Sequence, residues 1–118
     1  MKTVTVIILM VFALTAKGQI YVNGEAFDCN AKYIEVTYTK VKKQINSAYV
    51  FIDYGQAKKG EFQFITNEKG DKLEFNSPAH LLNYLDKKGY DLIDVELLDV
   101  YNRHVDTVYF IYYLKLKQ

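Results

Sequence analysis

The chain of 118 residues contains no tryptophan and only one cysteine, one proline and two histidines. With Cys29 as the single cysteine, no disulfide can form within the chain, so a hydrophobic core must hold the fold. We expect Cys29 to be an inert or buried thiol, the alternative being a bond to another molecule. A lipid anchor on Cys29 is not expected, because Asp28 stands where a lipoprotein signal needs a small residue.

The sequence also lacks an excess of charge of either sign, with 15 basic and 14 acidic residues and a net charge of +1. Two of the basic residues, Lys2 and Lys17, lie in the N-terminal segment that we expect to be removed, and without them the net charge is −1. The charges are interspersed, so no basic face or tail is available. We therefore expect no nucleic-acid partner.

Long apolar runs are absent except at the N-terminus, where VTVIILMVFAL (Val4–Leu14) follows a positively charged Lys2. Ala16 and Gly18 then provide the small residues of a cleavage site. The alternative is a membrane anchor, but a spanning helix needs about 20 apolar residues and this run is shorter. The pattern predicts a signal peptide over residues 1–18, cleaved after Gly18. We therefore expect export to the periplasm or the extracellular space, with no stable membrane insertion after cleavage.

Metal-binding and phosphate-binding motifs are missing as well: the chain has no H-x-x-x-H, no cysteine pair, no EF-hand loop and no phosphate-cradling glycine loop. Four acids gather in one expected strand, where alternation points Asp94 and Glu96 to one side and Asp91 and Asp99 to the other. A hydrated calcium contact is the alternative to a solvated sheet face, which we expect. The sequence thus predicts no metal and no cofactor.

Aromatic residues are abundant, with 11 tyrosines and 7 phenylalanines, and such rings pack well on the pleated surface of a sheet. Residues 19–32 show weak periodicity and are expected to form a weakly structured leader, with room for a short strand over residues 20–22. No repeat or linker divides the remainder. Residues 33–118 are therefore expected to form a single domain.

Four strands are expected before the helix. Residues 33–41 alternate between apolar and polar, which is typical of a half-buried strand, and residues 48–54 are apolar on both faces, which favours a central strand. These two strands are close enough in sequence for an antiparallel hairpin. Residues 61–66 and 72–75 are expected to form a second hairpin, with Gly70 in its loop and Phe62 and Phe64 packed on a partner such as Leu73 or Phe75.

The helix has the clearest sequence signals. Ser77 is suited to cap its N-terminus, and Pro78 is suited to the first helical position. An apolar stripe follows, formed by Leu81, Leu82 and Leu85. Gly89 can take the left-handed conformation just past the helix, which would bring Tyr90 against the last turn.

Two strands are expected after the helix. Over residues 91–101 the core face is expected to carry Ile93, Val95 and Leu97, with a bulge near Leu97–Leu98 where the alternation changes phase. Over residues 105–117 one face is expected to be core, with Val108, Phe110, Tyr112, Leu114 and Leu116. The complete pattern predicts an α+β fold: an antiparallel β-sheet of four to six strands with one helix packed on one face, in the order β-β-(β-β)-α-β-β.

Catalytic chemistry has little support. His80 is expected at the start of the helix and His104 in a turn, positions where a histidine is usually solvated. Asp53 ends an apolar strand, where burial could raise its pKa, but the same position suits a cap of the following turn. We expect no catalytic residue, and the remaining enzyme hypothesis is a small hydrolase that uses Asp53 with one of the two histidines.

The second face of the closing strand is the main binding candidate. Tyr109, Ile111 and Tyr113 share this face, which is either covered by another element or exposed to bind something. With Asp53 they are the predicted binding residues. We expect Tyr109 and Tyr113 to be more exposed than Phe110 and Tyr112.

FNSPAHLLNYLDKKGYDLIDV followed by VYFIYYLKLK resembles small families of domains of unknown function, built on L-L-N-x-L-x-x-x-G-[WY]-x-L-x-x-V and ending in a Y-x-x-L-K strand. It is most similar to small exported bacterial proteins that also carry V-F-I-D-Y-G-Q, here Val50–Gln56, and F-N-S, here Phe75–Ser77. The resemblance covers residues 47–117, and Tyr90 stands where tryptophan is commoner. These motifs are structural, so the resemblance implies a fold and carries over no catalytic or binding residue.

The sequence as a whole predicts a non-enzymatic exported domain that binds a protein or a small ligand in the cell envelope. The alternatives are the small hydrolase-like enzyme and an accessory domain whose tyrosine face forms a homo-oligomer. An enzyme would need a concave pocket that holds a histidine close to an acid. A binding or oligomer-forming domain would show an exposed aromatic patch instead.

Overall fold

The structure, a computed structural model, describes residues 19–27, 31–41, 48–57, 62–101 and 106–118. The predicted signal peptide (residues 1–18), Cys29 and His104 lie outside the described residues.

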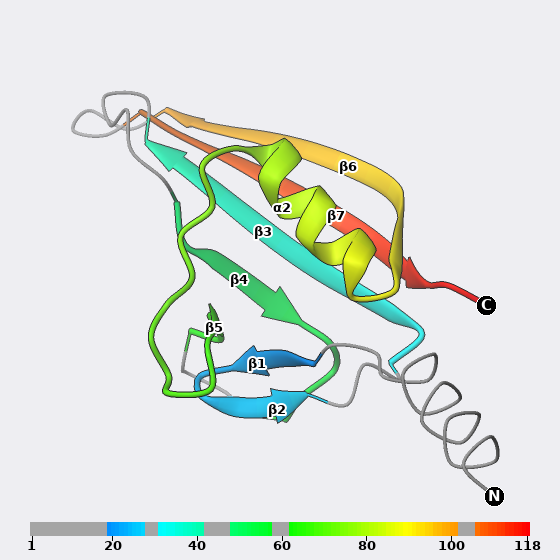
Figure 1. The fold of residues 1–118 in the computed structure, drawn as a ribbon. Coiled ribbons are helices and arrows are strands. Elements are labelled where there is room, and N and C mark those ends of the chain that lie inside the picture. The colour runs from blue at the N-terminus through cyan, green and yellow to red at the C-terminus, as the bar shows by residue number, and fades with distance from the viewer. Residues whose placement is uncertain (1–18, 28–30, 42–47, 58–61, 102–105) are drawn as a thin grey trace, which may run out of the picture.

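The described elements form two antiparallel sheets and one helix (Figure 1). In chain order they are β1 (Ile20–Val22), β2 (Glu25–Phe27), β3 (Tyr33–Val41), β4 (Val50–Asp53), β5 (Ile65–Thr66), α2 (Pro78–Lys87), β6 (Tyr90–Tyr101) and β7 (Asp106–Leu116). The larger sheet has the order β4-β3-β7-β6 and the smaller one β2-β1-β5. The α+β class is confirmed. The prediction of a single sheet is wrong, because a separate three-stranded sheet adjoins the larger one beyond β4.

Helix α2 begins and ends as the sequence predicts. The Ser77 side chain accepts a hydrogen bond from the His80 N–H at 3.1 Å, and Pro78 occupies the first turn. Past the helix, Gly89 has φ 97°, the left-handed region in which glycine is favoured. Tyr90 follows it, fully buried, and its hydroxyl donates to the Ala31 carbonyl at 2.8 Å. The chain is thereby fixed at the point where the helix ends and β6 begins.

The core lies between α2 and one face of the four-stranded sheet, and it continues into the small sheet. Leu81 and Leu85 of α2 are fully buried in it. The sheet and the other segments contribute further buried side chains: Ile20, Val22, Phe27, Ile34, Val36, Tyr38, Val50, Ile52, Ile65, Phe75, Tyr90, Tyr112 and Leu114. One continuous core therefore joins both sheets and the helix.

The predicted leader is part of this core. Within residues 19–32, β1 and β2 form a hairpin, with Asn23 at φ 49° and Gly24 at φ 84° in the turn. Ile20 is fully buried, and β1 also pairs with β5. The expectation of a weakly structured leader is corrected, because such short strands carry too few residues for periodicity to reveal them.

Strand β4 lies at an edge of the four-stranded sheet, not in its centre. It pairs with β3 as the predicted hairpin requires. Its apolar outer face is explained by an aromatic contact, since the Phe51 ring lies 4.7 Å from that of Phe64 and 5.1 Å from that of Phe62, measured between centroids. The predicted packing of these two phenylalanines on a second hairpin is therefore corrected.

That second hairpin is reduced to isolated pairings. Only Ile65–Thr66 is a strand, and Thr66 makes an isolated bridge to Lys72. Gly70 does take the left-handed conformation expected of the loop, with φ 89°.

Strand β6 has one irregularity, a shift of register with β7 between Leu92 and Asp94. The bulge predicted near Leu97–Leu98 is therefore misplaced. Ile93 is the extra residue of the bulge. It shifts by one position which side chains of β6 point to each face of the sheet, so the residues before it and after it follow opposite phases of the alternation.

The bulge places most apolar residues and most acids of β6 on opposite sides of the sheet, with Asp99 on the side that α2 covers and Leu98 on the other side as exceptions. Three apolar residues share the side of the sheet that α2 covers: Leu92, Val95 and Leu97. Three acids share the opposite side: Asp91, Asp94 and Glu96. The predicted burial of Ile93, Val95 and Leu97 is wrong, since all three are exposed. All three belong to β6, which is the outermost strand of the sheet (Figure 1).

Among the described residues, no helix is both long enough and apolar enough to cross a membrane.

Candidate binding site

The side of the four-stranded sheet opposite α2, hereafter the open face, carries the predicted binding residues of β7. Their cross-strand neighbours follow from the register: Tyr109 lies between Thr39 and Leu98, Ile111 between Thr37 and Glu96, and Tyr113 between Glu35 and Asp94. All three predicted residues are half-buried, whereas Tyr112 on the helix side is only 4% exposed. Phe110 is half-buried as well, so the expected contrast holds for Tyr112 alone.

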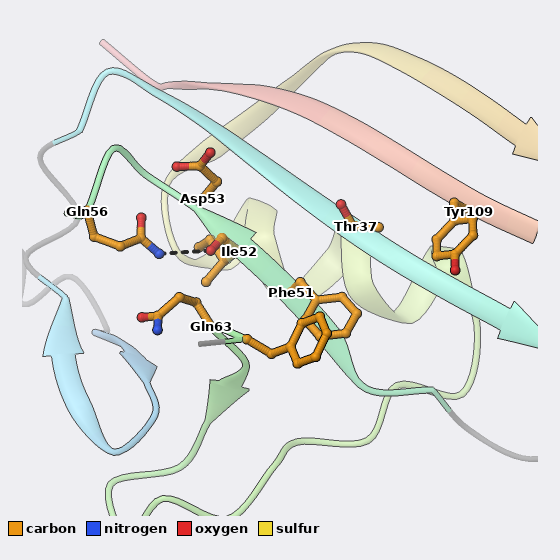
Figure 2. A pocket seen from close by; sticks show the side chains of 8 residues that line it. Thr37, Phe51, Ile52, Asp53, Gln56, Gln63 and Tyr109 are labelled. Atoms are coloured by element: carbon orange, nitrogen blue, oxygen red, sulfur yellow. Dashed lines mark hydrogen bonds between the residues drawn. The ribbon is translucent and has the colours of Figure 1, made fainter. Parts of the chain in front are cut away.

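A groove of about 420 Å³ crosses the open face over β3 and β4. Its walls come from four separate segments, and the residues are Thr37, Phe51, Ile52, Asp53, Gln56, Phe62, Gln63 and Tyr109. In Figure 2, Asp53 and Gln56 lie at one end of the groove and Tyr109 lies at the other. The structure thus brings Asp53 and Tyr109, two residues singled out from the sequence, into one site.

The aromatic part of the groove is built by the segment that follows residues 58–61. The Gln63 carbonyl accepts from the Ile52 N–H at 2.8 Å, and Phe64 forms a bridge with Phe51. This pairing brings Phe62 against Phe51 and leaves 73% of Phe62 exposed. An exposed phenylalanine beside a groove offers a flat apolar surface to a ligand.

The polar groups of the groove are the amides of Gln56 and Gln63, the Asp53 carboxylate and the hydroxyls of Thr37 and Tyr109. Gln56 is occupied, since its side-chain N–H donates to the Ile52 carbonyl and its oxygen accepts from the Tyr54 N–H, both within 2.9 Å. The side-chain nitrogen of Gln63 is buried and finds no acceptor among the described residues. A buried amide donor without an acceptor costs free energy unless a ligand or water supplies one.

Asp53 ends β4 and organises the turn that follows. One of its carboxylate oxygens accepts from the Gly55 N–H at 2.9 Å, and Gly55 has φ 93°. Asp53 is exposed, so the burial expected at the end of this strand is absent. Its geometry is that of a turn-capping carboxylate at the end of the groove.

The other half of the open face is acidic. Tyr113 donates from its hydroxyl to a Glu96 carboxylate oxygen at 2.9 Å. This hydrogen bond is the largest cause of the raised pKa of Tyr113, and the charges of Glu96, Glu35 and Asp94 act in the same direction. A phenol surrounded by three carboxylates resists becoming an anion, so this half of the face attracts cations.

The histidine that the structure describes does not join an acid of the groove. His80 lies at the start of α2, on the covered side of the sheet, and its Nδ1 accepts from the Asn76 N–H at 3.0 Å. Its ring packs on Phe75. Among the described residues, no group of three or more histidines, cysteines and acids is placed to hold a metal ion.

Sequence reasoning found Tyr109 and Asp53 but missed Phe51, Phe62, Gln63 and Thr37. The periodicity of β3 and β4 could have placed Thr37 and Phe51 on the face away from the core. Phe62 and Gln63 could not be placed in this way, because their position depends on a pairing with β4 that no local pattern encodes.

Comparisons with known proteins give no match: no family model, no curated protein and no solved structure is similar to this chain.

Proposed function

We propose that this chain is a non-enzymatic binding module of the cell envelope, and that the groove on the open face holds its ligand. The observation that supports this most is the exposed Phe62 beside a groove that contains Phe51, Tyr109 and Gln63, whose side-chain nitrogen has no acceptor among the described residues. Aromatic surfaces combined with a few fixed polar groups are typical of sites that bind a ligand.

Export is part of this proposal. The N-terminal pattern of residues 1–18 supports a signal peptide, and the resemblance to small exported bacterial proteins is consistent with it. Intact mass of the protein recovered from the envelope tests it: a chain that begins at Gln19 supports cleavage after Gly18, and a chain that begins at Met1 or carries a lipid on Cys29 contradicts it.

The hydrolase alternative has less support, because Asp53 caps a turn on the open face while His80 lies on the covered side. The oligomer alternative uses the same tyrosine face, and it is separated from ligand binding by measuring the mass of the protein in solution.

The experiment is an affinity capture from the envelope fraction with the wild-type protein and with a Phe62→Ser, Tyr109→Ser double variant. We expect the double variant to stay folded and to lose the bound material, since neither residue belongs to the core cluster. Tyr33→Ser is the matched control, because Tyr33 is an exposed aromatic residue outside the groove. Equal capture by the double variant and the wild type would contradict the proposal.

A further inference from the structure

The outer edge of β6 is a long strand edge without a neighbour. β6 is the last strand of the four-stranded sheet and spans 12 residues. In an antiparallel pair, alternate residues turn their N–H and C=O groups away from the partner strand. Within the part of the chain that the structure describes, no backbone group outside β7 bonds to those of residues 91–98. The edge therefore offers a row of donors and acceptors.

Natural sheets usually protect such an edge with lysine, proline, a short strand or a covering segment. The sequence of β6, YDLIDVELLDVY, contains neither lysine nor proline. Its protection is limited to the bulge before Asp94 and to the Asp94 carboxylate, which accepts from the Val95 N–H at 2.9 Å. The edge is therefore open to pairing along most of its length.

The side chains along the edge differ on the two sides of the sheet. On the helix side, Leu92, Val95 and Leu97 are 45%, 48% and 60% exposed. On the open face the strand presents the exposed carboxylates of Asp91, Asp94 and Glu96, of which Asp91 lies across from Lys115 of β7 and 3.8 Å from the Lys117 ammonium group. An added strand would place its own side chains beside these two rows, alternating in the same way.

The charge of the edge decides between possible occupants. A second copy paired antiparallel along β6 would keep its faces aligned with the first, and a register centred on Asp94 would bring the acids of the two open faces together. Like charges on neighbouring strands destabilise the pairing. By contrast, an added strand with lysine or arginine on one side and apolar residues on the other would place basic residues beside the acids and apolar residues beside the exposed apolar side chains of β6.

We propose that the outer edge of β6 binds an extended segment of a partner protein in which basic and apolar residues alternate, and that this segment adds to the sheet as a fifth strand. Its basic side chains lie beside Asp94 and Glu96 on the open face, because Asp91 is already paired with Lys117. Its apolar side chains cover Leu92, Val95 and Leu97. Main-chain hydrogen bonds provide the affinity, and the two rows of side chains provide the choice of partner.

The test uses a blocked peptide of alternating lysine and valine as the probe, added to the whole chain of 118 residues. We expect binding that weakens with salt, together with slower hydrogen exchange at the outward amides of β6. Two control peptides are needed: one keeps the lysines but has proline in place of alternate valines, and one has glutamate in place of lysine. Both are expected to bind about tenfold or more weakly, since proline removes backbone donors and glutamate meets the acids.

Equal binding of the proline peptide would overturn the proposal, because charge alone would then explain the affinity. Equal binding of the glutamate peptide, no binding of the lysine peptide, or a protein that self-associates through β6 without any peptide would overturn it as well.

A pair of variants locates the contact. Leu97→Lys places a charge on the exposed helix-side row and is expected to weaken peptide binding about tenfold or more while the protein stays folded. Tyr33→Lys adds the same charge at a residue of β3 that is 58% exposed, and it is expected to leave binding unchanged. A Phe62→Ser variant is also expected to leave it unchanged, so failure of the groove proposal and failure of this one are distinguishable. Equal effects of Leu97→Lys and Tyr33→Lys would contradict an edge site.

Discussion

The two edges of the four-stranded sheet are finished in opposite ways. At the β4 edge, the Ile52 N–H donates to Gln63, and Ala48 exchanges two backbone hydrogen bonds with Phe75 at 2.9 and 3.0 Å. At the β6 edge, the described residues provide no such covering segment, and the apolar side chains remain exposed. The β4 edge is therefore covered by other segments of the chain, whereas the β6 edge remains available for contacts with other molecules.

The largest expected effect contrasts a buried leucine of the helix with an exposed one of the edge. Leu85→Ala should lower the free energy of unfolding by about 2–5 kcal/mol, since Leu85 is fully buried. Leu97→Ala should change it by less than about 0.5 kcal/mol, since Leu97 is 60% exposed. Urea denaturation measures both. A Leu97→Ala loss as large as that of Leu85→Ala would show that the β6 edge is part of the core.

A smaller effect is expected at the junction that leads from α2 into β6. Gly89→Ala should destabilise the protein by about 1 kcal/mol, because alanine is strained at φ 97°. An added Cβ would meet no atom closer than the Leu116 Cδ1 at 3.9 Å, so the cost comes from the backbone and not from a clash. Gly89→Asn is the control and should cost less, since asparagine tolerates this conformation. Equal denaturation midpoints for wild type and Gly89→Ala would contradict the assigned geometry.

The smallest effect concerns alkaline pH and the covered side of the sheet. Burial raises the pKa of Tyr112, and the nearby Tyr38 adds to the shift. Because the folded-state pKa lies above the unfolded one, the resulting stability is complete below about pH 10 and is lost as the pH rises through the folded-state pKa. Tyr112→Phe should therefore unfold less readily than wild type as the pH increases, with Tyr33→Phe as the exposed control. Identical pH profiles for wild type and Tyr112→Phe would contradict this linkage.

The sequence predicts best what depends on neighbouring residues. Ser77, Pro78 and Gly89 act within one turn of the helix, and the strand over residues 33–41 has the same bounds in the structure. The second sheet could not be predicted in this way, because β1 meets β5 through pairings that join Tyr21 with Thr66 and Val22 with Ile65. Such long-range pairings leave little trace in local periodicity.

In the candidate site, too, residues placed by local alternation were predicted and residues placed by long-range pairing were not. Tyr109, Ile111 and Tyr113 follow from strand alternation alone, which places them on one face. The bulge of β6 lies a few residues before its predicted position, and this shift moves Asp91 to the side of Asp94 and Glu96 and Leu92 to the side of Val95 and Leu97. Edge position is also invisible to alternation, because an edge strand and a central strand can carry the same pattern.

Hydrogen exchange of the monomeric protein, followed residue by residue by NMR, tests the contrast between the two edges most directly. Because the outer edge of β6 is uncovered, we expect alternate amides of β6 to exchange at rates close to those of an unprotected chain. The Ile52 amide of β4 and the amides of β3 are expected to exchange slowly. Slow exchange at every amide of residues 91–100 in the monomer would contradict it, because the outer edge of β6 would then already be covered.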